Sequence, residues 1–580
     1  LDVELGASGL SAADLAVYFD SYKRHQTFAR LTSGDIVRLD EGARAAFGLA
    51  EDLGVDAVDL LDGVSLPASS TLFVDSMLAR TPALEADRDA AFRRTVERLD
   101  TLGKMDFTVP VSLKATLRGY QVDGYQWLGS LEHLGLGGIL ADDMGLGKTL
   151  QMIAHILARV EAGDTKPTLV VCPASLVYNW TAELERFAPS LDVCAIVGAK
   201  AQRRVQIAGA AEHNVVVTSY DLMRRDIDEY AGQDFARVVL DEAQYIKNPL
   251  TQVARATKRL PAGVRFALTG TPIENRLSEL WSIFDFLMPG LLGTRESFAK
   301  RFESPVEHAE GDSAARLQAL VSPFVLRRVK EDVVADLPEK IEDTVMAQLT
   351  GEQRKLYLAN QDRIAQQVQH REASEFKKDK LKVLAELTKL RQICCDPRLH
   401  YEDYKAGSAK LDTCMELVHG ALDGGHRILL FSQFTGMLDI IGKRLAKEDI
   451  AFLKLTGASS KESRAKMVAQ FQAGEVPVFL ISLKAGGVGL NLTAADVVIH
   501  YDPWWNVAAQ DQATDRAHRI GQQHTVTVYK LIAKDTIEER IMQMQESKRD
   551  LVNSVLGGDG ISSALFTRED VLALLGGDGR

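Results

Sequence analysis

The sequence predicts an α/β protein with two parallel-sheet lobes, helical insertions between them and a mainly helical N-terminal unit. Its 580 residues exceed the usual domain length of roughly 100 to 200 residues several times. Short apolar runs alternate with helical stretches in two separate parts of the chain, as is typical of parallel sheets covered on both faces. Hydrophobic residues make up 46% of the chain and charged residues 26%, so each unit can bury a core.

Residues 1–110 have the pattern of amphipathic helices with few strand signals, and they end at the turn-like segment Thr108–Pro110. They carry 11 Lys and Arg against 19 Asp and Glu, a net charge of -8 out of the total of -12. This acidic unit either partly covers a cleft of the sheet lobes or holds the lobes apart in a resting state, or it serves as a solubilising or partner-docking domain. The composition leaves both hypotheses open.

The first sheet lobe is predicted over residues 111–285 and the second over residues 406–534. The runs that predict strands of the first lobe are Gly138–Ala141, Thr168–Cys172, Val215–Thr218, Arg237–Leu240 and Arg265–Leu268. Those of the second lobe are Ile428–Phe431, Val478–Ile481, Val497–Ile499 and Val526–Tyr529. Residues 286–405 are mainly charged and interrupted by prolines, which predicts helical insertions and a linker. Residues 535–580 predict a long helix and a tail in which a short terminal helix ends at Leu575.

The segment Asp142–Thr149, between a strand and a helix, has the spacing of a phosphate loop. Its glycines let backbone N–H groups surround phosphate, Lys148 would meet the β and γ phosphates of ATP, and Thr149 would bind Mg²⁺. The strict motif has Gly at the position of Asp142, so the loop is a variant. The residues expected to contact ATP here are Asp143, Met144, Gly145, Leu146, Gly147, Lys148 and Thr149.

Two carboxylates, Asp241 and Glu242, follow the apolar run that ends at Leu240. At the tip of a parallel strand they would lie beside the phosphate loop, where Asp241 would hold Mg²⁺ and Glu242 would orient and deprotonate the attacking water. Gln121, shortly before the loop, is placed to hydrogen-bond adenine. The sequence therefore predicts an ATP-hydrolysing site with Mg²⁺ as its metal.

The order of these segments resembles superfamily-two helicases, and several strings are similar to those of the Swi/Snf branch. The strings are Leu117–Gln121, Asp142–Thr149, Val170–Ser175, Thr218–Tyr220, Asp241–Gln244, Leu268–Asn275, Phe431–Phe434, Ser482–Thr493, Asp502–Asn506 and Gln512–Gln522. The resemblance covers about residues 111–556 and implies two RecA-like lobes. Gln244 stands where many helicases have His, and Val507 where the family often has Pro, and neither change removes a catalytic group.

The resemblance implies that two arginines complete the ATP site from the second lobe, as fingers that neutralise charge on the γ phosphate. Arg516 and Arg519 are assigned this role. With Gln512 they are spaced by four and three residues, which predicts one helix face. The resemblance also adds Gly489 to the nucleotide contacts. In such a protein hydrolysis needs closed lobes, and product release lets them reopen.

The resemblance further implies that loops of both lobes grip one strand of double-stranded DNA through its backbone, without reading sequence. The residues expected to contact DNA are Ser175, Thr218, Ser219, Ser432, Gln433, Lys484, Gly486, Thr493 and Trp505. The basic segment Arg327–Lys330 is either a hinge or phosphate contact between the lobes or a solvated basic turn. The helix from Asp535 to Leu551 resembles the bracing helix of the family.

The predicted function is that of an ATP-dependent translocase on double-stranded DNA, which remodels or displaces an unidentified DNA-bound protein complex without separating the strands. A strand-separating DNA or RNA helicase and a nucleotide-gated DNA-binding scaffold are the alternatives. The five cysteines show no metal-binding or disulfide pattern, and no apolar run of membrane-spanning length is present. We expect a monomeric motor in the cytoplasm, associated with the nucleoid if the source is bacterial. Because residue 1 is Leu, the chain is expected to be a piece of a longer protein.

Overall fold

The computed structural model describes residues 2–3, 11–24, 26–53, 55, 64–65, 70–80, 87–99, 101, 105–270, 277–303, 313–333, 338–369, 373–483, 492–504, 507–519, 521–543, 571 and 574–575. The chain divides into two compact units. The first comprises Leu1–Asp143 and Gly147–Val329, and the second comprises Met144–Leu146 and Lys330–Arg580. Each unit is described by itself.

The N-terminal residues contain a small core of their own. Helices α1 (Ala12–Lys23) and α2 (Glu41–Leu53) enclose the antiparallel hairpin of β2 (Phe28–Arg30) and β3 (Ile36–Arg38). The buried side chains that join these elements are Leu15, Tyr18, Phe19, Ala29, Leu39, Phe47 and Ala50. A second antiparallel pair, β1 (Asp2–Val3) with β4 (Val64–Ser65), and helices α3 (Thr71–Arg80) and α4 (Ala90–Leu99) follow. The N-terminal region is therefore mainly helical, as predicted, with two short sheets added.

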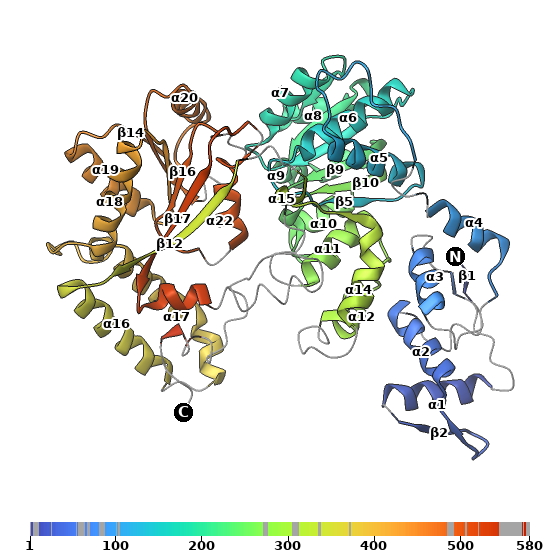
Figure 1. Ribbon diagram of the computed structural model, residues 1–580. Helices are drawn as coiled ribbons and strands as arrows, with labels where there is room; N and C mark the ends of the chain where they lie inside the picture. The colour runs from blue at the N-terminus through green and yellow to red at the C-terminus, as the bar shows by residue number, and fades with distance from the viewer. Residues whose placement is uncertain are drawn as a thin grey trace. The chain divides into compact units, whose positions relative to one another are not determined.

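The first large sheet has seven parallel strands in the order β11-β5-β10-β9-β6-β8-β7. The strands are β5 (Gly138–Leu140), β6 (Thr168–Cys172), β7 (Val193–Ala195), β8 (Val215–Ser219), β9 (Phe235–Asp241), β10 (Ala262–Leu268) and β11 (Val325–Leu326). The helices are α5 (Gly119–His133), α6 (Lys148–Glu161), α7 (Val177–Phe187), α8 (Lys200–Ala208), α9 (Tyr220–Arg225), α10 (Gln252–Lys258), α11 (Leu277–Leu287), α12 (Arg295–Phe298) and α14 (Ser313–Val321). Figure 1 shows α5, α6 and α7 on one side of the sheet and α10 and α11 on the other. Every residue of β5, β6 and β8 is buried, which explains their uninterrupted apolar runs.

The second large sheet has six parallel strands in the order β12-β17-β16-β13-β15-β14. The strands are β12 (Lys340–Gln348), β13 (Ile428–Ser432), β14 (Phe452–Leu455), β15 (Val478–Ser482), β16 (Val497–His500) and β17 (Val526–Lys534). Residues that alternate along these strands face two cores. One core packs on α18 (Ala409–Asp423) and α19 (Thr435–Lys447), and the other on α20 (Lys461–Gln472) and α22 (Val507–Thr514). The predicted fold class, two parallel-sheet lobes with helices on both faces, is confirmed.

Residues 286–405, for which helical insertions and a linker were predicted, also supply two strands that were not predicted. Residues Val325–Leu326 form β11 at the edge of the first sheet, and Lys340–Gln348 form β12, which pairs with β17 over its full length. Only Ala347 of β12 is buried, so this edge strand lacks the apolar run from which the other strands were predicted. The expected helices follow as α16 (Gly351–Gln369) and α17 (Ala373–Cys395).

Helices α16 and α17 share a third core with the C-terminal part of the second unit. Residues 537–543 are helical and place Ile537 and Ile541 in this core, where Val571, Leu574 and Leu575 are also buried. The remainder of the predicted bracing helix, to Leu551, lies outside the described residues, as does most of the chain expected to form the terminal helix before Leu575. Within the part of the chain that the structure describes, no helix combines the length and apolar character needed to cross a bilayer.

Candidate active site

The phosphate loop leaves the carboxyl end of β5 and enters α6 through two glycines with left-handed backbones. Gly145 has φ 88° and Gly147 has φ 80°, conformations that side-chain-bearing residues adopt only with strain. Gly147 is the N-cap of α6, so the first backbone N–H groups of the helix follow the loop directly. This is the local geometry by which such loops bind phosphate. Lys148 and Thr149 are the first two residues of α6 and are half-buried.

The Lys148 ammonium group lies over the start of its own loop. Its Nζ donates to the carbonyl oxygen of Asp142 at 2.5 Å and to that of Asp143 at 3.2 Å. Burial lowers the pKa of Lys148, while the carboxylates of Glu242, Asp142 and Asp241 oppose this shift. The lysine is therefore held by backbone carbonyls beside a cluster of negative charge, the position from which it could also serve phosphate oxygens.

The two predicted catalytic carboxylates lie at the end of β9 and differ in their surroundings. Asp241 is buried and its Oδ2 accepts a hydrogen bond from Trp180 Nε1 at 2.8 Å. Burial, with the Glu242 carboxylate beside it, raises the pKa of Asp241 to about 7. Glu242 is half-buried and has φ 53°, a left-handed conformation that is strained for this residue type. The strand thus ends with one buried carboxylate and one half-buried carboxylate.

A chain of hydrogen bonds orients Glu242. Gln244 Nε2 donates to Glu242 Oε2 at 2.8 Å, and Gln244 Oε1 accepts from the Thr269 hydroxyl at 3.0 Å. The Thr269 backbone N–H in turn donates to the carbonyl of Leu140 at 3.2 Å, at the end of β5. Gln244 therefore performs a positioning role with its amide at the place where many helicases have His.

Gln121 lies on α5 and is buried. Its Oε1 accepts a hydrogen bond from the Arg118 backbone N–H at 3.0 Å. A Cβ atom added to Gly147 would come within 2.5 Å of Gln121 Nε2, so this side chain lies against the phosphate loop. The structure thus places three of the predicted nucleotide-site segments together: the loop, the Asp241–Glu242 pair and Gln121.

Magnesium would find suitable donors in this arrangement. Mg²⁺ is usually held by one or two carboxylates together with substrate phosphates rather than by a cage of protein ligands. The Asp241 carboxylate and the Thr149 hydroxyl are oxygen donors of the required kind. Among the described residues, no group of three or more His, Cys, Asp or Glu side chains is arranged to hold a metal ion. The donor chemistry fits a metal that arrives with a nucleotide.

The residues predicted to contact DNA in the first unit differ in exposure. Ser175 is exposed, shortly after β6. Thr218 is fully buried with its hydroxyl donating to the Ile196 carbonyl at 3.4 Å, and Ser219 caps α9 by accepting from the Leu222 N–H at 3.4 Å. In this structure the two hydroxyl groups are thus engaged inside the protein.

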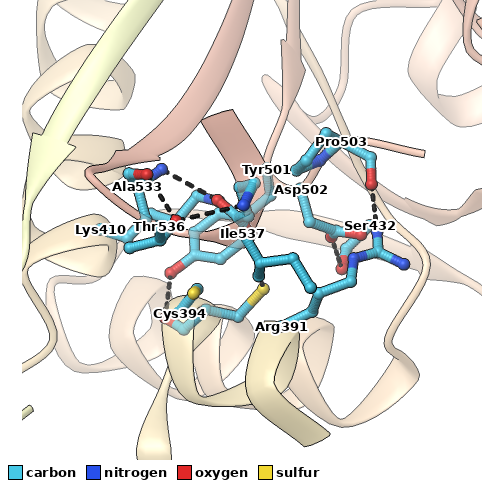
Figure 2. A network of polar contacts seen from close by, with 12 residues as sticks. Arg391, Cys394, Lys410, Ser432, Tyr501, Asp502, Pro503, Ala533, Thr536 and Ile537 are labelled. Carbon is cyan, nitrogen blue, oxygen red and sulfur yellow. Dashed lines mark hydrogen bonds and ion pairs between the residues drawn. The ribbon is translucent and has the colours of Figure 1, made fainter. Parts of the chain in front are cut away.

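In the second unit, Ser432 belongs to a buried polar network with Asp502 and Arg391 (Figure 2), and the neighbouring Gln433 is bonded to it. The Ser432 hydroxyl donates to Asp502 Oδ1 at 2.5 Å, and the Gln433 backbone N–H donates to Asp502 Oδ2 at 3.3 Å. Arg391, on α17, donates to Gln433 Oε1 at 3.3 Å and to the carbonyl of Pro503. Asp502 and Arg391 are both at most 1% exposed. Together they fix the segment after β13 to the segment after β16.

A buried ion pair lies in the same unit, and its lysine, Lys410, is labelled in Figure 2. Lys410 Nζ and Glu538 Oε2 are 2.5 Å apart, and both side chains are fully buried. Glu538 Oε2 also accepts from the Ala533 N–H at 2.9 Å, and the Thr536 hydroxyl donates to the Ala533 carbonyl at 2.6 Å. The pair fastens the first helix of the second lobe, α18, to the end of β17.

The placement of the arginines on one helix face is wrong. Helix α22 ends at Thr514, so Gln512 lies on it whereas Arg516 and Arg519 lie in the following turn. Beyond Thr514 the backbone forms a turn whose carbonyl groups accept from side chains: Gln522 Nε2 donates to the Ala517 carbonyl at 3.1 Å, and Lys330 Nζ donates to the His518 carbonyl at 2.7 Å. We call residues 515–519 the arginine turn. Arg516 is buried and Arg519 half-buried.

The remaining predicted contacts are only partly described. Thr493 is half-buried, and its hydroxyl accepts from Gln472 Nε2 at 3.4 Å. Four predicted site residues lie outside the described residues: Lys484, Gly486, Gly489 and Trp505.

Several residues that shape the site were not predicted from the sequence. They are Trp180, Gln151, Thr269, Arg391 and Asp502. Thr269 and Asp502 lie inside strings that resemble the family, so their positions carried a signal. Trp180, Gln151 and Arg391 lie on helices, at positions that ordinary core packing would also explain.

Three family models match the chain. The SNF2-related domain matches residues 120–399, the helicase conserved C-terminal domain matches residues 409–521, and the model described as bacterial SNF2 helicase associated matches residues 1–110. Together they include the acidic N-terminal region and every strand of the two large sheets except β17.

Individual relatives have the same character. The putative ATP-dependent helicase/translocase YwqA of Bacillus subtilis is 39% identical over 537 residues, which are 90% of this chain and 58% of that protein. TATA-binding protein-associated factor MOT1 of Saccharomyces cerevisiae is 34% identical over 552 residues, 83% of this chain and 30% of that protein. This chain thus spans less than two thirds of the length of either relative.

Among solved structures, the Sulfolobus solfataricus SWI2/SNF2 ATPase core in complex with dsDNA is 38% identical, over 78% of this chain and 95% of that one. The TM-score of 0.41 carries no argument about the arrangement of the parts, so the family follows from sequence. Because the SNF2-related and helicase C-terminal models between them contain the phosphate loop, the Asp241–Glu242 pair and the arginine turn, the chain belongs to the SNF2 family of helicase-related proteins.

Proposed function

We propose that the chain is a DNA-dependent ATPase, and that the group of Lys148, Asp241, Glu242 and Gln121 in the first unit is its nucleotide site. Lys148 binds the β and γ phosphates, and Asp241 with Thr149 holds the Mg²⁺ that arrives with ATP. Glu242, half-buried, with a left-handed backbone and oriented by Gln244, positions and deprotonates the attacking water. The observation that supports the proposal most directly is the convergence of these groups at one edge of a parallel sheet.

Arg516 and Arg519 are proposed to supply positive charge that neutralises the negative charge developing on the γ phosphate during transfer. Their position in a turn rather than on a helix suits this role, because a turn can present two side chains that are three residues apart without requiring a continuous helix face. Bound Mg²⁺ would supply further charge stabilisation on the phosphate oxygens.

The substrate track is proposed to be double-stranded DNA, along which the protein moves and displaces bound proteins without separating the strands. The proposal draws on the family to which the chain belongs and on its relatives. One is named a helicase/translocase, and another is named as a factor associated with a TATA-binding protein. The side chains proposed to contact DNA are mostly hydroxyl and amide groups. Such groups bind the DNA backbone, so the protein would follow the duplex without reading its sequence.

The test measures ATP hydrolysis with no nucleic acid, with duplex DNA, with single-stranded DNA and with RNA, followed by two displacement reactions. We expect duplex DNA to stimulate hydrolysis most and the protein to remove the third strand of a triplex. A forked duplex should stay paired. Lys148→Ala serves as the control without turnover. Efficient unwinding of the fork with no triplex displacement would identify a strand-separating helicase, and DNA binding without any stimulated hydrolysis would identify a nucleotide-gated scaffold.

A further inference from the structure

Asp142, the residue that departs from the strict phosphate-loop motif, is fully buried and paired with an arginine from far along the chain. Arg328 Nε donates to Asp142 Oδ1 at 2.8 Å and Arg328 Nη2 donates to Asp142 Oδ2 at 2.5 Å. The Asp142 side chain is 0% exposed and that of Arg328 is 11% exposed. A bidentate pair of this kind has a fixed geometry. Glycine at this position would leave Arg328 without its carboxylate.

The same guanidinium group joins the loop to the helices on either side of it. Arg328 Nη1 donates to the carbonyl of Tyr120, the neighbour of Gln121 on α5. Arg328 Nη2 also donates to Gln151 Oε1 at 2.8 Å, and Gln151 Nε2 donates to Asp142 Oδ2 at 3.1 Å. Gln151 lies on α6, one turn after Lys148. Arg328 therefore ties together the start of the phosphate loop, the helix that carries the predicted adenine contact and the helix that carries the lysine.

The space around this group is closely fitted. A Cβ atom on Gly124 would lie 1.9 Å from Gln151 Oε1 and 2.7 Å from Arg328 Nη2, so only glycine lets α5 approach. The backbone adds two more ties, because the Ala141 N–H donates to the Leu326 carbonyl at 2.7 Å and the Asp143 N–H donates to the Arg328 carbonyl at 2.9 Å. The chain at Arg328 thus cannot shift without moving the loop.

Two residues later, Lys330 makes a comparable attachment within the second unit. Its Nζ forms an ion pair with Asp515 and donates to the His518 carbonyl at 2.7 Å. Lys330 is 6% exposed. Asp515 directly precedes Arg516, and His518 directly precedes Arg519. The lysine therefore holds the arginine turn at the two residues that directly precede the proposed finger arginines.

We propose that residues 328–330, here called the connector, mechanically couple the phosphate loop of the first unit to the arginine turn of the second through the chain itself. Arg328 is the positioning residue for the phosphate loop and α5, and Lys330 is the positioning residue for the arginine turn. Only Val329 separates them, and the chain passes from the first unit to the second at this point. A change at one attachment is therefore transmitted to the other through a very short length of backbone. The inference rests on the proposed function, because it explains how the phosphate loop and the arginine turn, both proposed to act in ATP hydrolysis, are coupled.

Burial distinguishes the connector from a solvated basic turn. A cation removed from water needs full compensation by partners, and losing one partner of a buried pair is strongly destabilising. Arg328 has a carboxylate, an amide and a carbonyl, and Lys330 has a carboxylate and a carbonyl. Two such sets of partners so close together in sequence, each beside a different group of predicted catalytic residues, favour a positioning role.

The direct test lengthens the connector while keeping both attachments. Two glycines inserted after Val329 leave Arg328 and Lys330 with their own partners but decouple them. We expect the affinity for a fluorescent ATP analogue and for duplex DNA to stay within about twofold of the parent. Hydrolysis stimulated by duplex DNA should fall by about tenfold or more, equal to ~1.4 kcal/mol or more in the barrier. A connector with no coupling role predicts stimulated hydrolysis close to that of the parent, which would overturn the inference.

Point variants keep the test valid if the insertion lowers stability. Lys330→Gln should lower stimulated hydrolysis while leaving analogue affinity unchanged, whereas Arg328→Gln should weaken analogue affinity because the loop and α5 lose their common tie. Arg259→Gln and Lys454→Gln remove the same charges from exposed pairs with Asp228 and Asp439 and should match the parent in both measurements. Lys330→Arg, which preserves the charge, should recover part of the lost hydrolysis. Equal effects of Arg328→Gln and Lys330→Gln on analogue affinity would contradict the division of roles.

The design separates this inference from the proposed function. If duplex DNA fails to stimulate the parent protein, the proposed DNA-dependent motor is wrong, and the connector is then tested by the same variants on basal hydrolysis and on analogue affinity. If the parent is stimulated and the insertion variant is stimulated equally, the function stands and the connector is wrong.

Discussion

The two large sheets are built alike, yet the residues at their carboxyl ends are used differently. At the end of the first sheet, Lys148 and Glu242 are half-buried, Lys148 donating to backbone carbonyls and Glu242 accepting from the Gln244 amide. At the end of the second, Asp502 is 1% exposed and occupied by Ser432 and Gln433. The ionisable groups Lys148 and Glu242 at the end of the first sheet remain partly accessible to solvent, whereas Asp502 at the end of the second sheet is buried.

The electrostatics of the two edges differ in the same way. Burial beside Glu242 raises the pKa of Asp241 to about 7, so its negative charge is costly until a cation approaches. In the second unit burial would lower the pKa of Lys410, but the adjacent Glu538 carboxylate raises it overall. The charges of the second unit are thus satisfied within the protein. The difference indicates a reactive edge in the first unit and a fixed platform in the second.

The strongest test of this difference removes the reactive groups of the first edge. Lys148→Ala should nearly abolish ATP hydrolysis because the phosphates lose their cation. Glu242→Gln should retain ATP binding and lose turnover, since the amide cannot take a proton from water. The rate of ATP hydrolysis and the affinity for a fluorescent ATP analogue, measured on the same preparations, check the expectations for both variants. Hydrolysis near the parental rate in Glu242→Gln would mean that another group is the base.

The arginine turn is expected to give the next largest effect. Arg516→Ala or Arg519→Ala should lower DNA-stimulated turnover by a factor of about 10³, the scale found for arginine fingers in related phosphoryl transfer. Binding of duplex DNA should persist, because neither residue is proposed to contact the track. Steady-state turnover and DNA affinity measure the two properties separately. If both single variants turn over normally, the fingers lie elsewhere.

A smaller effect is expected where the second edge positions a predicted DNA contact. Arg391→Gln removes the group that holds Gln433 and the Pro503 carbonyl, so duplex affinity should fall by about tenfold, or ~1.4 kcal/mol, with analogue affinity unchanged. Arg398→Gln is the matched control, because Arg398 pairs locally with Asp396 and is 40% exposed. Unaltered duplex affinity in Arg391→Gln would show that this network does not support the track.

The platform itself is expected to affect stability rather than catalysis. Lys410→Met should lower the free energy of unfolding by about 3 to 5 kcal/mol, because it leaves the Glu538 carboxylate buried without its cation. The double variant Lys410→Met with Glu538→Leu should recover much of this loss. Chemical denaturation followed in the second unit provides the measurement. The folded variants should bind the ATP analogue like the parent, and weaker analogue binding would contradict the separation between the two edges.

Much of the candidate site could be predicted because its signals are local. The left-handed backbones at Gly145 and Gly147 favour glycine. A lysine directly after them indicates a phosphate loop without any information from the rest of the chain. The apolar runs of β6 and β8 indicate strands buried on both faces. By contrast, β12 carries no such run, because one of its faces is mostly exposed, and its place beside β17 could not be predicted.

The sequence by itself determined the two-sheet fold, the phosphate loop and the Asp241–Glu242 pair, since periodicity and short motifs act over a few residues. Only the tertiary structure decided the partner of Asp142, which lies 186 residues away at Arg328, and the partner of Lys330, which lies 185 residues away at Asp515. It also decided that α22 ends at Thr514 and that Lys330, far away in the sequence, donates to a carbonyl of the turn that follows. Such choices depend on which charged and polar groups are buried together, a property that folding creates and that no local pattern contains.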